Sequence, residues 1–414
     1  MLSRLHVTGF KSLVDVDVRF PRLTVLFGPN AVGKSNLLDA LLVLSRVATE
    51  RTLGEALSGP VRGYPIECFL FPDGGLPVLL EKERTEFKLE ADLSSQAGAE
   101  RLRYRVTIGI QPRSGILSVI DEYLCRLSAE DKPRGEPSIE VVEGKVQIRR
   151  KGQGRPRVEP LGLNYSIVSD RRLSSPIYPM IERARSELSS FRSYYLDPRI
   201  AMRQPRPPRE VVDIGTLGES LAPFLYRLRT SKENRRAYDQ VVRTVRTIIP
   251  SIESVSVELD EKQGTLDLQI EQGGVTYSAR LASEGTLRVL ALAALAVNPW
   301  PGAIVAFEEP ENGVHPRRLE LIARLLGAIS IEQGQQVIVT THSPLFCQQI
   351  LHLQREHPDK VALLVVRQEG GATRCDPFHA TGPLFDDPDI RKALTSSQED
   401  GTFEGLALRG LVDG

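Results

Sequence analysis

Residues 28–35 read Gly28-Pro29-Asn30-Ala31-Val32-Gly33-Lys34-Ser35, and this stretch decides the fold. Its spacing, G-x-x-x-x-G-K-S, is that of a phosphate-binding loop. The apolar run 23–27 precedes it and predicts a buried strand, while residues 36–44 are strong helix formers. In the order strand, glycine-rich loop, helix, backbone N–H groups and the positive end of the helix can hold phosphate oxygens.

The chemistry of this loop gives individual residues expected roles. Lys34 is expected to reach the β- and γ-phosphates of ATP, and the Ser35 hydroxyl to ligate Mg²⁺. The alternative is a chance match in a glycine-rich turn, which the flanking strand and helix disfavour. The predicted nucleotide-binding segment is Gly28, Pro29, Asn30, Ala31, Val32, Gly33, Lys34, Ser35 and Asn36.

A second motif follows far downstream, where the apolar run 303–307 ends in Glu308 and Glu309. A buried strand that ends in two acids is the usual partner of a phosphate loop. We predict that Glu308 holds the Mg²⁺ shell and that Glu309 is the general base that polarises the attacking water. A strand ending in a solvated turn is the alternative, and the upstream phosphate loop disfavours it.

Two shorter motifs are weaker in isolation. Ser283-Glu284-Gly285-Thr286 begins an apolar stretch, and taken alone it is a helix cap with Ser283 as the N-cap residue. His342 follows the apolar run 336–340, at a strand's carboxyl end, where open α/β sheets bind ligands. A lone histidine at such a place is more often structural than catalytic.

The amino-acid composition limits which classes of protein this chain can belong to. The 414 residues include 53 basic and 53 acidic ones, and 41% are hydrophobic, which is enough for a large core. The four cysteines are scattered, with no C-x-x-C pair, so we expect neither a disulfide framework nor a zinc site, in keeping with a reducing cytoplasm. No apolar run of membrane-spanning length and no signal-peptide pattern is visible, so we expect a cytoplasmic protein without a membrane contact.

The order of patterns along the chain predicts a split organisation. Residues 1–50 and 275–380 read as one discontinuous α/β lobe, in which helices alternate with short apolar strands. Residues 51–160 read as β-rich, with mostly loop up to residue 75. Residues 161–274 read as helical, with helices over 177–195 and 217–248 and returning strands. The tail 381–414 is polar and weakly patterned.

A local excess of positive charge lies in the middle of the chain, with fifteen Lys or Arg against seven Asp or Glu between Val141 and Glu210. Such a stretch could follow a DNA backbone, or it could be a solvated mixed-charge surface or a site for an acidic partner protein. The candidate DNA contacts are Arg149, Arg150, Lys151, Arg155, Arg157, Arg199, Arg203, Arg206 and Arg209.

The four motifs, in this order and together with residues 9–12 (G-F-K-S), resemble the ABC-type ATPases of the SMC and RecF group. They resemble more closely the standalone ABC-like AAA-family ATPases of bacterial defence and repair systems. The motif-bearing segments are 1–50 and 275–370, and the 307–316 segment reads F-E-E-P-E-N-G-V-H-P. The resemblance implies an α/β P-loop NTPase of the ABC ATPase type, whose ATPase lobe is split by a β-rich and helical insertion.

The resemblance also implies how such a protein works. Relatives form head-to-head dimers with two ATPs between the subunits, so ATP binding and dimerisation are coupled. Ser283 and Gly285 would contact the γ-phosphate of ATP held by the second subunit, and His342 would sense that phosphate. Glu311 and Asn312 would lie in the loop that crosses the dimer interface. Two departures stand out: Glu308 where many relatives have Asp, and S-E-G-T in place of the transporters' L-S-G-G-Q.

These motifs do not indicate which biological process the ATPase would drive, or through which effector. Relatives of the overcoming-lysogenization type carry a Toprim nuclease after the histidine motif, but residues 343–414 are too few for such a domain here. We therefore expect any effector to be a separate protein, as in the PARIS and Septu systems. The favoured hypothesis is an ATP-hydrolysing dimer in DNA-related work or phage defence. The alternatives are a RecF-like repair ATPase and a nucleotide-gated scaffold with little turnover.

Overall fold

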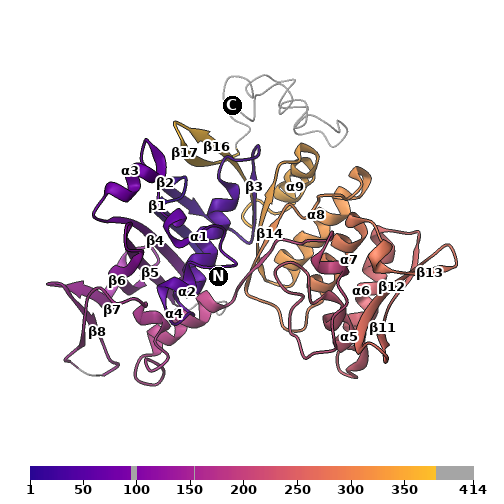
Figure 1. Cartoon of the computed structure of the whole chain (residues 1–414), viewed down its shortest axis with the longest axis horizontal. Helices are drawn as coiled ribbons and strands as arrows, with labels where there is room; N and C mark the ends of the chain where they lie inside the picture. Colours follow the sequence, from indigo (N-terminus) through magenta and orange to yellow (C-terminus); the bar gives the residue numbers. More distant parts are fainter. Residues whose placement is uncertain (95–99, 153, 379–414) are drawn as a thin grey trace. The chain divides into compact units, whose positions relative to one another are not determined.

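The computed structural model describes residues 1–94, 100–152 and 154–378 of the chain. The chain forms two compact units, each built from segments distant in sequence (Figure 1). Unit 1 contains Met1–Pro21, Pro29–Phe191 and Val366–Asp376. Unit 2 contains Arg22–Gly28, Arg192–Val365 and residues 377–378, and the predicted tail 381–414 lies outside the described residues. The phosphate loop therefore leaves unit 2 at Gly28 and continues in unit 1 from Pro29.

Unit 1 is built on an antiparallel eight-stranded sheet in the order β2-β1-β4-β5-β6-β7-β8-β9. Its strands alternate buried and exposed side chains, as expected for a sheet with one face packed on a core. The strands are β1 (Leu2–Phe10), β2 (Leu13–Arg19), β4 (Thr85–Ser94), β5 (Arg101–Gln111), β6 (Ile116–Leu127), β7 (Pro133–Val142), β8 (Lys145–Ile148) and β9 (Arg157–Pro160).

Four helices belong to unit 1: α1 (Lys34–Val47), α2 (Leu53–Ala56), α3 (Gly75–Glu81) and α4 (Pro179–Ser189). Helix α1 is mainly apolar and mostly buried, because Leu37, Leu41 and Leu44 recur at helical spacing. The Ser45 hydroxyl near its end donates a hydrogen bond to the carbonyl of Leu188 in α4, at 2.7 Å. The two helices are thereby tied together although they are far apart in the sequence.

A fully buried carboxylate, Glu122 of β6, anchors the segment between β9 and α4. It accepts hydrogen bonds from the hydroxyls of Tyr104 and Ser166, and from the backbone N–H groups of Ile167 and Val168, at 2.7–3.1 Å. Burial raises the pKa of Glu122, while these hydrogen bonds act to lower it. The carboxylate thus supplies acceptors to a short 3₁₀ turn (Ile167–Ser169) that would otherwise bury unsatisfied donors.

Unit 2 centres on parallel strands. The six-stranded sheet has the order β10-β14-β15-β3-β16-β17, and β14, β15, β3 and β16 pair in parallel. Strand β16 begins beside β3, and its last residues belong with β17 to unit 1. The strands are β3 (Leu23–Phe27), β10 (Phe191–Tyr194), β14 (Ile304–Glu308), β15 (Gln336–Thr341), β16 (Val361–Glu369) and β17 (Ala372–Pro377).

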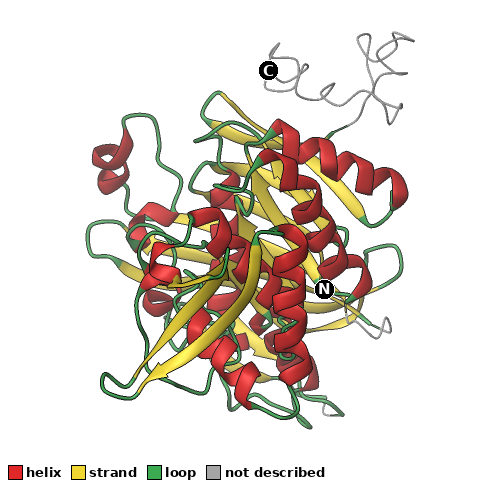
Figure 2. Cartoon of the chain, turned by 90° about the vertical axis from the view of Figure 1, so that its right-hand side faces the viewer, coloured by secondary structure: helices red, strands yellow, loops and turns green. Residues whose placement is uncertain are grey.

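Helices and a small second sheet complete unit 2 (Figure 2). Helix α7 is apolar on nearly every side and lies in the core. The small antiparallel sheet has the order β11-β12-β13. The elements are α5 (Leu221–Thr230), α6 (Arg235–Ile248), α7 (Glu284–Ala296), α8 (Leu319–Gly327), α9 (Pro344–Glu356), β11 (Ile252–Asp260), β12 (Thr265–Gln272) and β13 (Val275–Ser278).

The α/β alternation predicted after residue 275 is confirmed, with β14 and β15 at the predicted apolar runs 303–307 and 336–340, and so is the parallel sheet. Two predictions in the middle of the chain were wrong in detail. The helix expected over 177–195 ends at Ser189, because the aromatic residues of Phe191–Tyr194 form β10 instead. The helix expected over 217–248 is broken at residues 231–234. The mostly loop stretch before residue 75 contains the short helix α2 and a 3₁₀ turn (Pro65–Cys68). The helices of the described residues are all too short or too polar for a membrane crossing.

The Glu122 network generates a stability prediction. Glu122→Ala would remove the carboxylate that four buried donors share, and Ile167 N–H would lose its acceptor outright, whereas Val168 N–H and Tyr104 could still pair with Ser166 Oγ. The free energy of unfolding should therefore fall by about 2–4 kcal/mol. The matched control is Glu86→Ala, at an exposed position of β4, which should change it by less than about 0.5 kcal/mol. Urea unfolding of both variants measures the difference, and equal stabilities would contradict a structural role for Glu122.

Candidate active site

The ends of three parallel strands define one edge of the unit 2 sheet. Register pairs Glu308 of β14 with Thr340 of β15, and Thr341 of β15 with Phe27 of β3. The N–H of Gly28 donates to the carbonyl of Thr341 at 3.4 Å. The start of the phosphate loop, the acidic pair and the histidine motif therefore follow neighbouring strand ends, which is where open α/β sheets bind ligands.

Glu309 and His342, both predicted to be catalytic, are brought together here. His342 Nδ1 lies 2.8 Å from Glu309 Oε1, and the Asn312 side-chain amide donates to Glu309 Oε2. The backbone of Glu309 has φ 46°, in the left-handed region that non-glycine residues seldom adopt. This strained turn, fixed by the bond from Glu309 N–H to Thr340 C=O at 2.9 Å, aims the carboxylate at His342.

Glu311 lies in the same acidic loop but points inward. It is buried and accepts a hydrogen bond from the Thr341 hydroxyl, and burial raises its pKa above the ordinary range. Its second oxygen, Oε2, is buried without a hydrogen-bond partner. Thr341 Oγ in turn accepts the N–H of Ser343 at 3.0 Å, so Glu311 braces the acidic loop against the histidine motif.

The Ser283 motif has a local structural role that the sequence also predicted. Ser283 is the N-cap of α7, and its hydroxyl accepts the N–H of Thr286 at 3.1 Å. Gly285 has a further reason to be glycine: a Cβ atom there would lie 2.1 Å from the carbonyl oxygen of Gly313. The start of α7 therefore packs backbone against backbone on the loop that follows Glu309.

Arg288, one turn further along α7, is a site residue that the sequence reading missed. Its Nε atom is buried without a hydrogen-bond partner. Burial lowers the pKa of its guanidinium, while the charges of Glu284, Glu311 and Glu309 counteract that effect. Arg288 thus adds positive potential beside the acidic loop; a charged residue on an apolar helix was its one signal in the sequence.

The phosphate loop itself lies in unit 1 from Pro29 onward. Gly33 has φ 100° and precedes α1, whose first turn has no side-chain cap. Uncapped N–H groups at a helix start are the groups that bind phosphate oxygens. Lys34 is buried, and its ammonium donates to the Pro29 carbonyl at 2.7 Å, which curls it over the loop. The nucleotide-binding role of Gly28–Asn36 stays a prediction, and the geometry of the loop is compatible with it.

A chain of hydrogen bonds in unit 1 holds this loop from outside. Asn36 Nδ2 donates to Ser12 Oγ at 2.8 Å, Ser12 Oγ lies 2.7 Å from Thr373 Oγ1, and Thr373 Oγ1 donates to the carbonyl of Val32 at 2.9 Å. A Cβ on Gly33 would lie 2.1 Å from Thr373 Oγ1. Thr373, in β17, was missed by sequence reasoning because no local pattern marks it.

A buried carboxylate ties the 9–12 motif to α1. Asp39 accepts from Lys11 Nζ at 2.6 Å and from Arg62 Nε at 3.2 Å, and Arg62 also donates to the carbonyl of Ser35 at 2.8 Å. The motif recognised as G-F-K-S therefore supports the nucleotide-binding segment through Lys11 and Ser12. Arg62 had no signal of its own in the sequence.

The residues present fit ATP with Mg²⁺. Gly33 has the left-handed backbone conformation that the loop needs before the helix, and the start of α1 has no side-chain cap. Among the residues that the structure describes, no group of three His, Cys, Asp or Glu side chains forms a metal cluster. Mg²⁺ is commonly held by one or two protein groups together with substrate phosphates, so a site of this kind does not require such a cluster.

The two predicted basic clusters fall in different units. In unit 2, Arg199 pairs with Glu284 at 2.8 Å, and Arg203 donates to the carbonyls of Pro198, Arg280 and Ala282. Arg206 donates to Gln204, and Arg209 to the Ser220 hydroxyl. This cluster mainly supports the segment leading into α7. In unit 1, Arg149 and Arg157 have carboxylate partners, whereas Lys151 and Arg155 are exposed.

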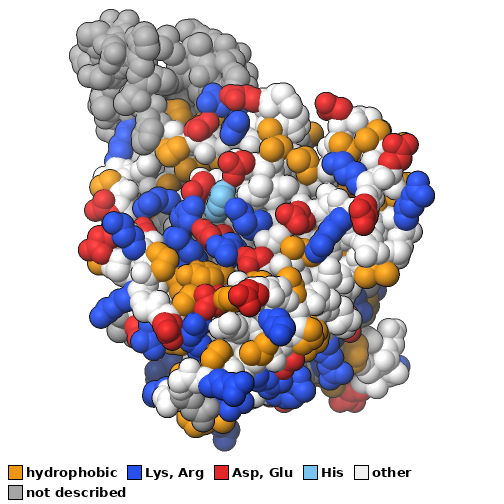
Figure 3. Space-filling model, turned by 90° about the vertical axis from the view of Figure 1, so that its left-hand side faces the viewer, with side chains coloured by type: hydrophobic (Ala, Val, Ile, Leu, Met, Phe, Trp, Pro, Cys, Tyr) orange, Lys and Arg blue, Asp and Glu red, His pale blue; other side chains and the backbone are white. Residues whose placement is uncertain are grey.

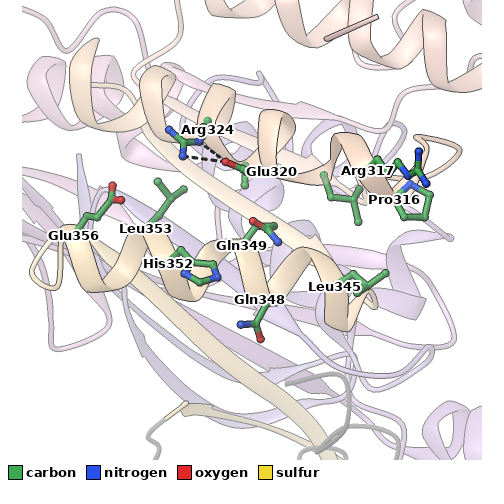
Figure 4. Close-up of a pocket in the computed structure, with 12 residues that line it drawn as sticks. Pro316, Arg317, Glu320, Arg324, Leu345, Gln348, Gln349, His352, Leu353 and Glu356 are labelled. Atoms are coloured by element: carbon green, nitrogen blue, oxygen red, sulfur yellow. Dashed lines mark hydrogen bonds and ion pairs between the residues drawn. The ribbon is translucent and has the colours of Figure 1, made fainter. Parts of the chain in front are cut away.

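A groove of about 660 Å³ between α8 and α9 is separate from these features (Figure 4). Glu320 and Arg324 form an ion pair on α8, and Gln349 extends from α9 toward α8 in the same groove. The groove has no glycine-rich loop and no convergent carboxylates. It is therefore not the phosphate-binding site.

The close approach at Gly285 generates a prediction. Gly→Ala inside a helix usually stabilises by about 0.5–1 kcal/mol, but Gly285→Ala should destabilise the protein by at least about 1 kcal/mol because its Cβ meets the Gly313 carbonyl. Gly54→Ala in α2, where the nearest atom is 3.9 Å away, is the control and should be neutral or stabilising. Thermal unfolding compares them, and a stabilised Gly285→Ala protein would contradict the packing described.

The chain is similar in sequence to a protein family and to several curated proteins. Residues 23–348 match the family model described as "AAA domain, putative AbiEii toxin, Type IV TA system". Curated relatives include the DNA replication and repair protein RecF of Porphyromonas gingivalis, 32% identical over 107 residues, which are 22% of this chain and 29% of that protein. RecF of Acaryochloris marina is 46% identical over 67 residues, which are 14% of this chain and 18% of that protein. The chain thus spans less than a third of the length of these relatives.

Solved structures show the same fold. An SMC head bound to the C-winged helix domain of ScpA has a TM-score of 0.52 at 14% identity, over 91% of this chain and 98% of that chain. An Smc head with an extended coiled coil from Pyrococcus furiosus, bound to the C-terminal domain of ScpA, has a TM-score of 0.50 at 13% identity, over 95% of this chain and 100% of that chain. Because the family model covers well over half of the chain, the protein belongs to this AAA-domain family and is an ABC-type ATPase of the SMC and RecF type in fold.

Proposed function

We propose that this protein binds and hydrolyses ATP, and that it dimerises around ATP to drive or gate a DNA-related or anti-phage complex with a separate effector. The observation that carries the proposal is the coupling of Glu309 with His342 and Asn312 at the strand end beside the start of the phosphate loop. A carboxylate oriented by two side chains is suited to accept a proton from water.

In the proposed hydrolysis of ATP, each of the predicted site residues has a distinct role. Lys34 and the first N–H groups of α1 bind the phosphates, and Ser35 and Glu308 are the protein ligands for Mg²⁺. Bound Mg²⁺ would neutralise charge on the β- and γ-phosphates. Glu309 accepts a proton as water attacks the γ-phosphorus and the bond to the ADP oxygen breaks, while His342 holds the Glu309 carboxylate in place.

Dimerisation is supported by the exposed start of α7. Ser283 is exposed at the positive end of this helix, and neighbouring Leu281 is 79% exposed. An apolar side chain so exposed beside an anion-binding helix end suits a surface covered by a second copy. We propose that Ser283 approaches the γ-phosphate on that copy, with Gly285 allowing close packing around it, as the family resemblance implies.

A second candidate is a RecF-like repair or recombination ATPase, which the similarity to two RecF proteins favours. A third is a nucleotide-gated scaffold, in which ATP binding assembles the complex and turnover is slow. A PARIS- or Septu-like ATPase component with a separate effector is the defence form of the main proposal. The three differ in whether turnover and DNA are needed for biological output.

Turnover by the purified protein tests the main proposal. Lys34→Ala and Glu309→Gln should each reduce the ATP hydrolysis rate by roughly 100-fold or more, because they remove phosphate binding and the general base. Glu309→Gln should also accumulate as an ATP-bound dimer, seen by light scattering. Glu261→Gln, at an exposed position, is the control. A wild type without turnover under any condition would leave only the scaffold candidate.

Thr373 provides an independent prediction about the phosphate loop. Thr373→Val keeps the shape but removes the hydroxyl that joins Ser12 to the Val32 carbonyl, so affinity for a fluorescent ATP analogue should fall roughly tenfold. Thr373→Ser should restore affinity to within about twofold, since it keeps the hydroxyl. Thr276→Val, on exposed β13, is the matched control. Equal affinities for Thr373→Val and wild type would contradict a positioning role.

A further inference from the structure

A basic pocket in unit 1 is not used by the proposed ATPase chemistry. Its volume is about 250 Å³, and it lies among β6, the β7–β8 hairpin and the start of α4. Five cationic side chains line it: Arg126, Arg134, Arg149, Arg150 and Lys151. We propose that this basic pocket binds a phosphate of a nucleic-acid backbone. The inference deepens the DNA-related part of the proposed function and rests on it for biological purpose, although the binding itself needs no ATP turnover.

Two arginines stand opposite each other in this pocket. The register of the antiparallel pair β6–β7 places Arg126 directly across from Arg134. Like charges at directly opposed positions destabilise a sheet. Arg134 has no carboxylate or hydrogen-bond partner for its side chain within the described residues, and Arg126 has only Glu100, at 3.9 Å. An anion that bridges the two guanidinium groups would relieve this repulsion.

The remaining cations leave the pocket with an excess of positive charge. Arg149 is neutralised by Glu136 and Glu140, at 2.9 and 2.6 Å. Arg150 Nε donates to the Tyr178 hydroxyl at 3.0 Å, which fixes its guanidinium at the pocket wall. Lys151 is exposed, and its ammonium has no carboxylate partner in the described part of the chain. Glu136 is the one acid among the lining residues, and it already serves Arg149.

The start of α4 adds to the same field. Pro179, Met180 and Ile181 form its first turn and line the pocket. Tyr178, the N-cap residue, provides no side-chain cap, so the N–H groups of Met180 and Ile181 keep their donor capacity. The helix start carries a partial positive charge that favours an anion. Guanidinium groups and a helix start therefore converge on one small cavity.

The side chains that line the pocket favour a backbone phosphate over a base as the ligand. Tyr178 is only 6% exposed, so the pocket offers no aromatic face on which a base could stack. Lys151 and Arg155 are exposed in the loop between β8 and β9, and Arg155 adds positive charge outside the residues that line the cavity. Lys and Arg side chains gather toward the lower edge of the face shown in Figure 3. A chain of phosphates can follow such a surface, and binding should be independent of sequence.

The test is DNA binding by the full-length protein without nucleotide, measured by fluorescence anisotropy over a salt series. Probes are a random-sequence duplex and a single strand of equal length. Arg134→Glu with Lys151→Glu should weaken duplex binding by roughly tenfold or more, and should reduce the magnitude of the salt slope by about two, one contact per cation. Lys232→Glu with Arg236→Glu, at exposed positions of unit 2, makes the same charge change and should retain most of the affinity.

Further readouts separate this proposal from its rivals. Arg134→Ala should weaken DNA binding while leaving stability unchanged or higher, because it removes the repulsion with Arg126. Equal losses in the two double variants, or competition by polyglutamate as strong as that by DNA at equal charge, would overturn the nucleic-acid assignment. Both double variants should keep wild-type ATP hydrolysis. DNA binding without any ATP turnover would contradict the proposed ATPase function but would still support the proposed DNA-binding pocket. ATP turnover without salt-dependent DNA binding would support the ATPase function and contradict the DNA-binding pocket.

Discussion

The candidate site depends on the backbone hydrogen bonds that hold β3 between β15 and β16. Because all three strands run parallel, their carboxyl ends must come to the same edge of the sheet. This constraint delivers the start of the phosphate loop beside Thr341, and through β14 it delivers Glu308 and Glu309 to the neighbouring position. Strands from residues 23, 304 and 336 onward thus act together although the chain separates them widely.

Close backbone approach is the second theme of the structure. Gly33 and Gly285 belong to different motifs in different units, yet both are places where a methyl group would meet an oxygen atom at 2.1 Å. At Gly33 that oxygen is the Thr373 hydroxyl, which also holds the Val32 carbonyl. At Gly285 it is the carbonyl of Gly313, in the loop that begins with strained Glu309. In both places the motif glycine makes packing possible around a functional loop.

The arginines illustrate how similar sequence patterns serve different purposes. In the cluster near residues 199–209, Arg199 and Arg203 bond to Glu284 and to the carbonyls of Arg280 and Ala282, at the start of α7 and just before it. Arg206 and Arg209 bond to Gln204 and Ser220. In the cluster near residue 150, Lys151 has no carboxylate partner within the described part of the chain, and the register of β6 and β7 places Arg126 opposite Arg134 in the same pocket. A count of charges treats the two clusters alike, and only hydrogen-bond partners distinguish a structural arginine from one available to a ligand.

The sequence alone was enough to predict the features of this protein that depend on short stretches of neighbouring residues. The phosphate loop, the two-acid strand end, the cap at Ser283 and the α/β alternation after residue 275 each have a pattern within a few residues, because periodicity and turn chemistry act over short range. The sequence also placed Glu309 and His342 at strand ends. Only the tertiary structure decided that they contact each other, that Thr373 closes on the phosphate loop, that Arg288 stands beside the acidic loop and that Arg126 faces Arg134. These contacts depend on strand register and on segments far apart in the chain, and no local pattern of side chains encodes them.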